Sequence, residues 1–308
     1  MISEAIPILL LDLLLAAALA GGPATHGRFV LSAETGGGWA SDAFLGAGLG
    51  AGPFAQLAPG ARVDLSLGPR VKLAAGAGLS FGRFGAGPFS FASQAAGVEA
   101  RFLPGKADFE AGVALAGERS TFSAPAPLAG TASGTGVTRT AAALVTPSVR
   151  LRRRSITWRG TLTGAARSSR VGGEDVGERG LAAQAGGEWT ARPWLRLDLA
   201  AYHERTASDR PDFARIATSG AAGAAAWPLG EAGPGLALAI SVQRTRFDTG
   251  VRETLARASV DASQPVGPVE ALLSISSSRS VEDGADLPSS HRQVVFLGVR
   301  GRARVLGW

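Results

Sequence analysis

The sequence predicts an all-β fold, an up-and-down antiparallel β-barrel of about fourteen strands, with twelve to sixteen compatible with the pattern. Three observations predict it. Apolar and non-apolar residues alternate with a period of two in segment after segment, which is typical of strands with two different faces. Short turns rich in Gly, Pro or charge alternate with longer polar connections. The chain has 43 Gly and only 13 Phe, 6 Trp and 1 Tyr, a poor basis for a packed core because burial energy scales with apolar area.

The stretch 63–81, VDLSLGPRVKLAAGAGLSF, shows the alternation most clearly. Two alternating runs flank a Gly-Pro turn, which predicts an antiparallel hairpin. In a membrane barrel one face of this hairpin contacts lipid and the other contacts the lumen. We expect the lipid-facing residues to be Val63, Leu65, Leu67, Val71, Leu73 and Phe81. We expect the lumen-facing residues to be Asp64, Ser66, Lys72 and Ser80.

The same reasoning applied along the chain gives fourteen strands. They are expected at about 26–36, 57–67, 70–83, 91–102, 106–118, 137–151, 155–167, 179–191, 194–205, 214–227, 235–247, 252–263, 268–279 and 291–307. Six short turns alternate with seven longer connections, which include 168–179 and 247–252. Strict alternation predicts one end of short turns and one end of long loops, with both termini at the short-turn end.

The polar or small character of one face in strand after strand favours a membrane barrel. A two-layer sandwich would alternate in a similar way. It would not explain fourteen comparable strands, a secretion signal and unequal loops together. Strands cross a bilayer only when no edge is left unpaired, so the barrel is expected to be closed.

The amino-terminal residues predict a targeting segment. An apolar run from Ile6 to Ala20 is short for a membrane-spanning helix and ends in an A-x-A-like site. Residues 1–20 are therefore expected to be a signal peptide cleaved near Ala20 or Ala24, and 26–308 a single barrel domain. Glu4 and Asp12 are atypical of such a signal, and an uncleaved helix is the alternative reading.

The final strand, HRQVVFLGVRGRARVLGW, ends in an aromatic residue after alternating apolar positions. This resembles the terminal signal of bacterial outer-membrane β-barrel proteins as a class, with no one family indicated. The resemblance implies a Gram-negative outer-membrane location, contact with outer-membrane lipid, and recognition of the last strand by the barrel-assembly machinery. It also implies an aromatic girdle at the membrane interface. The residues expected at the interface or in the terminal signal are Trp158, Trp194, Trp227 and Trp308.

Composition excludes several other functions. The chain has no cysteine, which excludes disulfide scaffolds and thiolate chemistry. Its formal charge is +6 and all but two of its 31 basic residues are arginine, but they are scattered rather than gathered in a nucleic-acid-binding patch. The three histidines lie far apart, no calcium loop is present, and no cofactor or metal is expected.

The lumen face carries the most informative residues. Arginine ladders can line anion-preferring pores. The first hypothesis is a passive channel for small solutes with a mild anion preference. The alternative is a non-conducting structural or surface-interaction barrel that works through its extracellular loops. The lumen charges would then form salt bridges across the lumen, which tie the wall together and plug it. The candidate pore-lining residues are Lys72, Glu110, Arg150, Arg152, Arg159, Arg196, Asp198, Arg257, Arg300, Arg302 and Arg304.

A third hypothesis is a hydrolase at the barrel rim. His203 and His291 both lie near the loop ends of strands, and each has serine or acidic residues nearby in sequence. A hydrolase needs a nucleophile, a base and an orienting partner within hydrogen-bond reach. Alternation places His203 on the lipid-facing side, so no catalytic residue is assigned.

Overall fold

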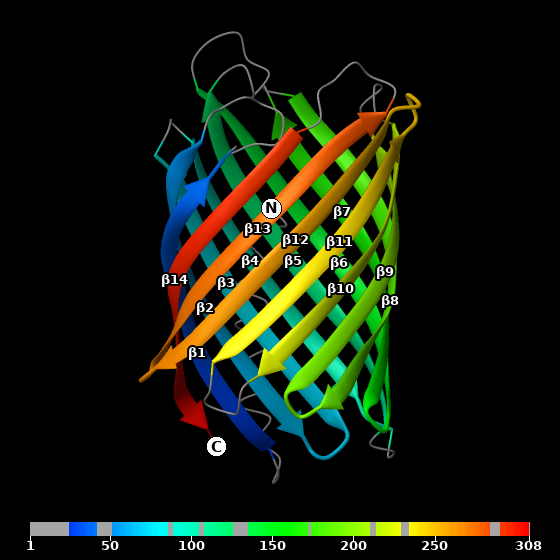
Figure 1. Ribbon diagram of the computed structural model, residues 1–308. Coiled ribbons are helices and arrows are strands. Elements are labelled where there is room, and N and C mark those ends of the chain that lie inside the picture. Colours follow the sequence, from blue (N-terminus) through cyan, green and yellow to red (C-terminus); the bar gives the residue numbers. More distant parts are fainter. Residues whose placement is uncertain are drawn as a thin grey trace.

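A computed structural model describes residues 25–41, 51–85, 89–104, 108–125, 135–171, 174–209, 214–228, 234–283 and 290–307. These residues form a closed barrel of fourteen tilted strands (Figure 1). The signal segment 1–20, both cleavage sites and Trp308 lie outside the described residues. The strands are β1 (Thr25–Ala40), β2 (Gly52–Leu67), β3 (Val71–Phe84), β4 (Phe89–Phe102), β5 (Phe109–Pro125), β6 (Thr135–Arg153), β7 (Ile156–Val171), β8 (Glu174–Arg192), β9 (Leu195–Ser208), β10 (Arg215–Pro228), β11 (Gly235–Phe247), β12 (Arg252–Val266), β13 (Val269–Asp283) and β14 (Ser290–Gly307).

Each strand pairs antiparallel with the strands before and after it in the chain, and β1 closes the barrel by pairing with β14. The fourteen-stranded up-and-down order predicted from the sequence is therefore confirmed. Closure gives every strand two neighbours, so no row of backbone N–H and C=O groups is left at an open edge. Among the described residues, no helix is long and apolar enough to cross a membrane.

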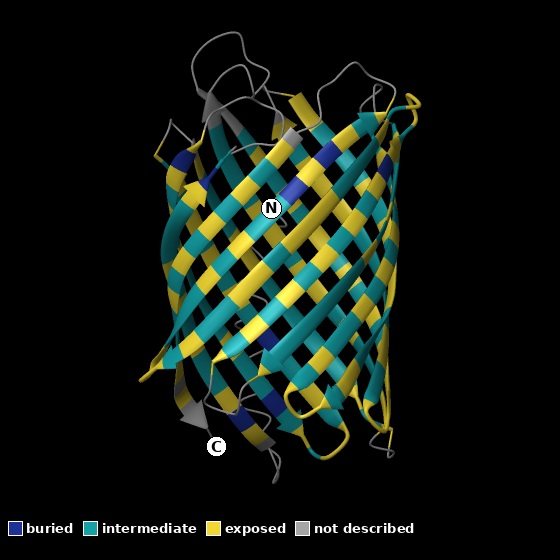
Figure 2. Cartoon of the chain, in the orientation of Figure 1, coloured by how far each residue is buried: buried dark blue, intermediate teal, exposed yellow. Residues whose placement is uncertain are grey.

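The two faces of the wall differ as the alternation predicts (Figure 2). Large apolar side chains cover the outside, and Leu199, Ile240 and Leu297 expose 69%, 68% and 62% of their surface. Apolar side chains this exposed indicate a surface that contacts an apolar environment such as lipid. Leu67 and Phe81 lie on this outer face. Leu65 shares the face through alternation but is itself only 5% exposed.

The strands extend further than the sequence suggests. They contain 13 to 19 residues, whereas about 9–11 tilted residues cross a bilayer. Antiparallel pairing therefore extends over more residues than a bilayer crossing requires, mainly by added residues at the loop end.

This extension shortens two connections that were expected to be long. Only residues 172–173 separate β7 from β8, and Asp248–Val251 joins β11 to β12 in a tight turn in which Gly250 has φ of +88°. Gly and charged residues occur both in loops and at the ends of strands. Their presence in these segments therefore did not distinguish a loop from the end of a strand.

Candidate functional site

The lumen of the barrel is the candidate site. The register between paired strands places many of the predicted residues on its wall. Glu110 on β5 stands opposite Arg150 on β6, and Arg150 stands opposite Arg159 on β7. Lys72 on β3 stands opposite Arg101 on β4. All of these residues belong to the inward-facing set of their strands, near the short-turn end of the barrel.

A polar cavity of about 640 Å³ gathers five of the predicted residues at this end. Residues from β3, β5, β6 and β9 contribute to it, although they are far apart in sequence. Sequence reasoning missed two of its charged neighbours, Asp108 and Arg154, because both lie in turns, whereas alternation already places Glu188 on the lumen face. The charged residues that line it, named here the turn-end cluster, are Lys72, Asp108, Glu110, Arg150, Arg152, Arg154, Glu188 and Arg196.

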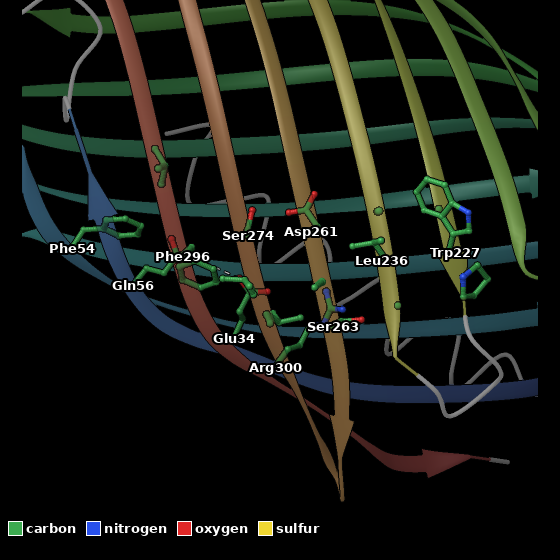
Figure 3. A pocket seen from close by; sticks show the side chains of 18 of the residues that line it. Glu34, Phe54, Gln56, Trp227, Leu236, Asp261, Ser263, Ser274, Phe296 and Arg300 are labelled. Atoms are coloured by element: carbon green, nitrogen blue, oxygen red, sulfur yellow. Dashed lines mark hydrogen bonds between the residues drawn. The ribbon is translucent and has the colours of Figure 1, made fainter.

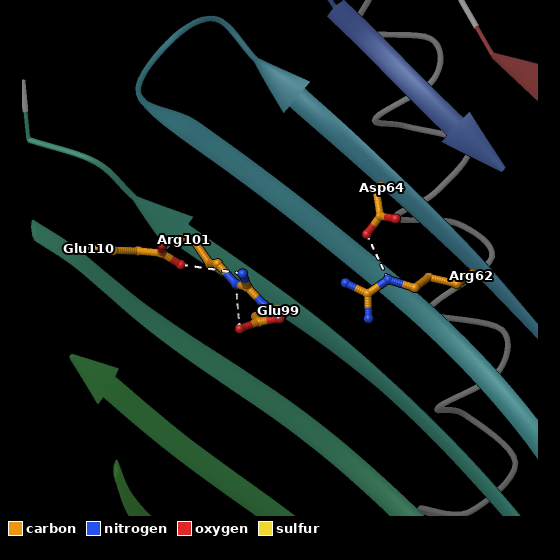
Figure 4. A network of polar contacts seen from close by, with 5 residues as sticks. All are labelled: Arg62, Asp64, Glu99, Arg101 and Glu110. Atoms are coloured by element: carbon orange, nitrogen blue, oxygen red, sulfur yellow. Dashed lines mark hydrogen bonds and ion pairs between the residues drawn. The ribbon is translucent and has the colours of Figure 1, made fainter. Parts of the chain in front are cut away.

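Ion pairs at the turn end run along the wall (Figure 4). The Arg101 guanidinium contacts Glu99 on its own strand at 2.7 Å and Glu110 on the next strand at 3.4 Å. Arg62 contacts Asp64, two residues away on β2, at 2.7 Å. Short links of this kind fix the long side chains against the sheet instead of extending them into the lumen.

The remaining lumen pairs have the same character. Arg196 contacts Glu188 on the adjacent strand at 3.3 Å, and Arg300 contacts Glu270 on the adjacent strand at 2.6 Å. Arg159 and Asp198 pair across one intervening strand. In the described part of the chain, no ion pair crosses the lumen, contrary to the salt-bridged plug considered from the sequence.

Other predicted basic residues lack a carboxylate within 4.0 Å among the described residues. These are Lys72, Arg150, Arg152, Arg257 and Arg302. Arg257 stands opposite Ser241 and Ser278, nearer the loop end than the other members of this group. The backbone of Arg304 pairs with Val30, and its side chain is outside the described set.

A second cavity of about 760 Å³ is lined by residues of β1–β4 and β9–β14 (Figure 3). Phe54 stacks on Phe296 with ring centroids 6.2 Å apart. Gln56 donates a hydrogen bond to Glu34, and Arg300 also lines the space. The cavity therefore combines an aromatic surface with fixed charges. Trp227, expected at the membrane interface, is among its lining residues.

The loop-end half of the lumen has the opposite charge, which sequence reasoning did not identify. Its inward-facing carboxylates outnumber the inward-facing basic residues there, Arg167, Arg257 and Arg292, among the described side chains. Three of these carboxylates, Glu174, Glu178 and Glu282, lie in segments expected to be loops, where alternation assigns no face. The carboxylates are Glu118, Glu174, Glu178, Glu204, Glu253 and Glu282.

The two rim histidines are on the outer face. The imidazole of His203 contacts the Ser219 hydroxyl at 2.8 Å and accepts a hydrogen bond from Arg205 at 3.2 Å. His291 contacts Ser277 at 3.0 Å. Among the described residues, neither imidazole hydrogen-bonds to a carboxylate of the kind that orients the base of a hydrolase. Within the described ranges, no group of three or more potential ligands could hold a metal ion.

Exposed indoles mark the outer wall at the turn end. Trp158, Trp189 and Trp194 expose 55%, 47% and 52% of their surface. Trp158 and Trp194 were predicted from the sequence to lie at the membrane interface. Indoles combine an apolar ring with a polar N–H, which suits the boundary between lipid and water.

Comparison with known proteins agrees on the fold. No protein-family model matches the sequence, and no curated protein matches it either. Among solved structures, outer-membrane OmpT of Vibrio cholerae has a TM-score of 0.56 at 9% identity, covering 92% of this chain and 99% of that one. An anion-selective porin from Comamonas acidovorans gives 0.51 at 12% identity, covering 91% and 100%. A Pseudomonas aeruginosa FadL homologue gives 0.50 at 8% identity, covering 94% and 92%.

These likenesses and the closed fourteen-stranded wall agree with the resemblance that the terminal strand carries. The outer membrane is the location that this fold supports. The chain has the fold of bacterial outer-membrane β-barrel proteins, and no particular family is assigned within that class.

Proposed function

We propose that the chain forms a passive channel for small solutes, with a mild preference for anions set at its turn end. The observation that carries the proposal is the arrangement of lumen charges. All ion pairs of the described wall link side chains within one strand or over at most one intervening strand, so charge neutralisation does not require groups to meet across the lumen.

The anion preference rests on the turn-end cluster. It contains five basic residues and three acidic ones, and two of the acids are engaged with arginines, Glu110 with Arg101 and Glu188 with Arg196. Among the described residues, Lys72, Arg150, Arg152 and Arg154 are left without such a partner, as is the third acid, Asp108. Fixed positive charge in a confined aqueous space raises the local anion concentration, as charged rings do in other pores. The acidic loop end opposes this effect, so we expect the preference to be mild.

Reversal potentials in a planar bilayer test the proposal. With a salt gradient across the membrane, the refolded protein should give stable steps and a reversal potential on the anion side. Replacing Arg150 and Arg152 by Ser should move that potential toward the cation side, because two unpaired positive charges leave the cavity. Arg119→Ser with Arg139→Ser is the matched control, since both arginines face outward.

Each result bears on a separate part of the proposal. Absence of steps from folded protein would overturn the channel and favour a non-conducting surface-interaction barrel. Steps with a cation-side potential would overturn the anion preference alone. An equal shift in the control variant would show that the effect comes from total charge and not from the turn-end cluster.

A further inference from the structure

Arginines on the outside of the barrel form a feature that the channel does not use. Each of the nine consecutive strands from β5 to β13 has at least one outward-facing arginine within six residues of its loop end. We call these residues the outer arginine belt. Strands β5–β8 contribute Arg119, Arg139, Arg170 and Arg179. Strands β9–β13 contribute Arg205, Arg215, Arg244, Arg246, Arg252 and Arg279.

The belt lies one membrane thickness from the exposed indoles. Arg170 follows Trp158 by about 12 residues on β7, Arg179 precedes Trp189 by about 10 on β8, and Arg205 follows Trp194 by about 11. A tilted strand crosses the hydrocarbon core in about 9–11 residues. With the indoles at one interface, these guanidinium groups are at the level of the lipid headgroups at the other.

Most arginines of the belt have no described carboxylate within 4.0 Å. Among the described residues, its one ion pair joins Arg170 to Asp175 at 3.5 Å. Arg139 stands directly opposite Arg170, and Arg246 directly opposite Arg252, in the antiparallel ladder. Asp283 is the ladder partner of Arg252 on its other side, beyond ion-pair distance. Like charges opposite one another destabilise a sheet, so these pairs favour an anion between them.

One part of the belt has the shape of a shallow cradle. Ala217 and Ser219 on β10 form a floor of small side chains. Arg205 borders the floor on the β9 side, and Arg244 and Arg246 border it on the β11 side. The two flanking strands are about 10 Å apart, twice the spacing of adjacent strands. Long arginine side chains from both sides can therefore reach one anion above the floor.

We propose that the outer arginine belt binds the phosphate groups of anionic lipid headgroups in the leaflet around the loop end, most strongly over Ala217 and Ser219. Guanidinium groups hold phosphate oxygens through paired charge-assisted hydrogen bonds. The Arg205 guanidinium uses its Nε–H on His203 at 3.2 Å, which fixes its direction and leaves its terminal N–H groups available.

Binding of a short-chain lipid to the protein in neutral detergent tests this site. Calorimetric titration with dihexanoyl phosphatidic acid is compared with dihexanoyl phosphatidylcholine and with inorganic phosphate. The triple variant Arg205→Ser, Arg244→Ser and Arg246→Ser should bind phosphatidic acid at least about tenfold more weakly, since each basic residue near a lipid surface contributes appreciably to binding. Its single-channel conductance should be unchanged.

Two further variants guard against loss of folding and against effects of total charge. The matched control, Arg150→Ser, Arg152→Ser and Arg302→Ser, removes three lumen arginines and should bind phosphatidic acid as the wild type does. Ala217→Glu keeps all the arginines and places a carboxylate on the floor, so it should also weaken binding. Equal binding by the wild type, the triple variant and Ala217→Glu would overturn the proposal. Equal affinity for phosphatidylcholine, or displacement by inorganic phosphate at the same concentration, would overturn the lipid assignment.

Discussion

Single glycines allow aromatic side chains to lie against the lumen wall. A Cβ atom at Gly82 would overlap the ring of Phe91, its partner across the ladder, and a Cβ at Gly220 would be 2.5 Å from the Tyr202 ring. Both aromatic side chains therefore need a glycine beside them to lie flat. The sequence alone does not show this, because the partner of each glycine depends on the register between strands.

Replacing Gly82 by Val should destabilise the barrel by about 1–3 kcal/mol, because the added methyl groups displace the Phe91 ring. The measurement is urea unfolding in lipid vesicles followed by tryptophan fluorescence. Gly78 is on the same face of β3, and a Cβ there would be 3.8 Å from the nearest atom, an ordinary contact. Gly78→Val is therefore the control. Equal destabilisation of the two variants would contradict the role given to Phe91.

At the scale of the strand, alternation predicted most of what the structure shows. The fourteen strands, their order and the outward set of β11 were all available from a period of two. Strand ends were not, because Gly, Ser and charged residues occur both in loops and in strand segments outside the lipid. Only two residues of the outer arginine belt, Arg119 and Arg170, fall in expected loops. The others lie in expected strands, where alternation gives their face, but their gathering at one level of the barrel depends on the register between strands.

The sequence also does not predict which side chains on strands that are two apart form ion pairs. Arg159 pairs with Asp198 across β8. Alternation places both residues on the lumen face, but it does not give the shear of the barrel that brings them to one height. The predicted residues that meet around the turn-end cluster were likewise identified one by one and not as a group.

Neighbouring residues of β11 provide the sharpest test of the two faces. Ile240 is 68% exposed on the outer face, and Ser241 faces the lumen. Ile240→Arg should destabilise the folded protein in lipid vesicles by about 2–4 kcal/mol, the cost of an arginine at the membrane midplane. Ser241→Arg should cost far less if the lumen holds water, as the proposed channel requires. The urea midpoint of the folded gel band measures both, and equal losses would contradict the assignment of lipid to the outer face.

At the scale of the whole molecule, charge is divided along the barrel axis. Basic residues of the turn-end cluster occupy one end of the lumen, and carboxylates such as Glu178, Glu204 and Glu253 face the other. On the outer surface, three exposed indoles lie at the turn end and the outer arginine belt lies at the loop end, where Trp39 is also 45% exposed. The molecule therefore has a defined orientation relative to the bilayer, both inside and outside.

The divided lumen predicts a current that depends on the sign of the voltage. With the loop side positive, cations enter past the carboxylates and anions enter past the turn-end cluster, so both ions accumulate and the current is larger. Glu178→Gln, Glu204→Gln and Glu253→Gln together should reduce this asymmetry. The effect should be stronger at 0.1 M than at 1 M salt, because screening lengths shorten from about 10 Å to 3 Å. If the asymmetry is unchanged in the triple variant, these carboxylates are not its cause.

In the proposed channel, the charged residues of the wall pair with near neighbours and leave a water-filled path across the membrane. Single-channel recording of refolded wild-type protein in a planar bilayer tests it most directly, with folding confirmed by heat-dependent gel mobility. The proposed channel should give discrete, long-lived conductance steps that grow with salt concentration. Folded protein that inserts into the bilayer and gives no steps would contradict it.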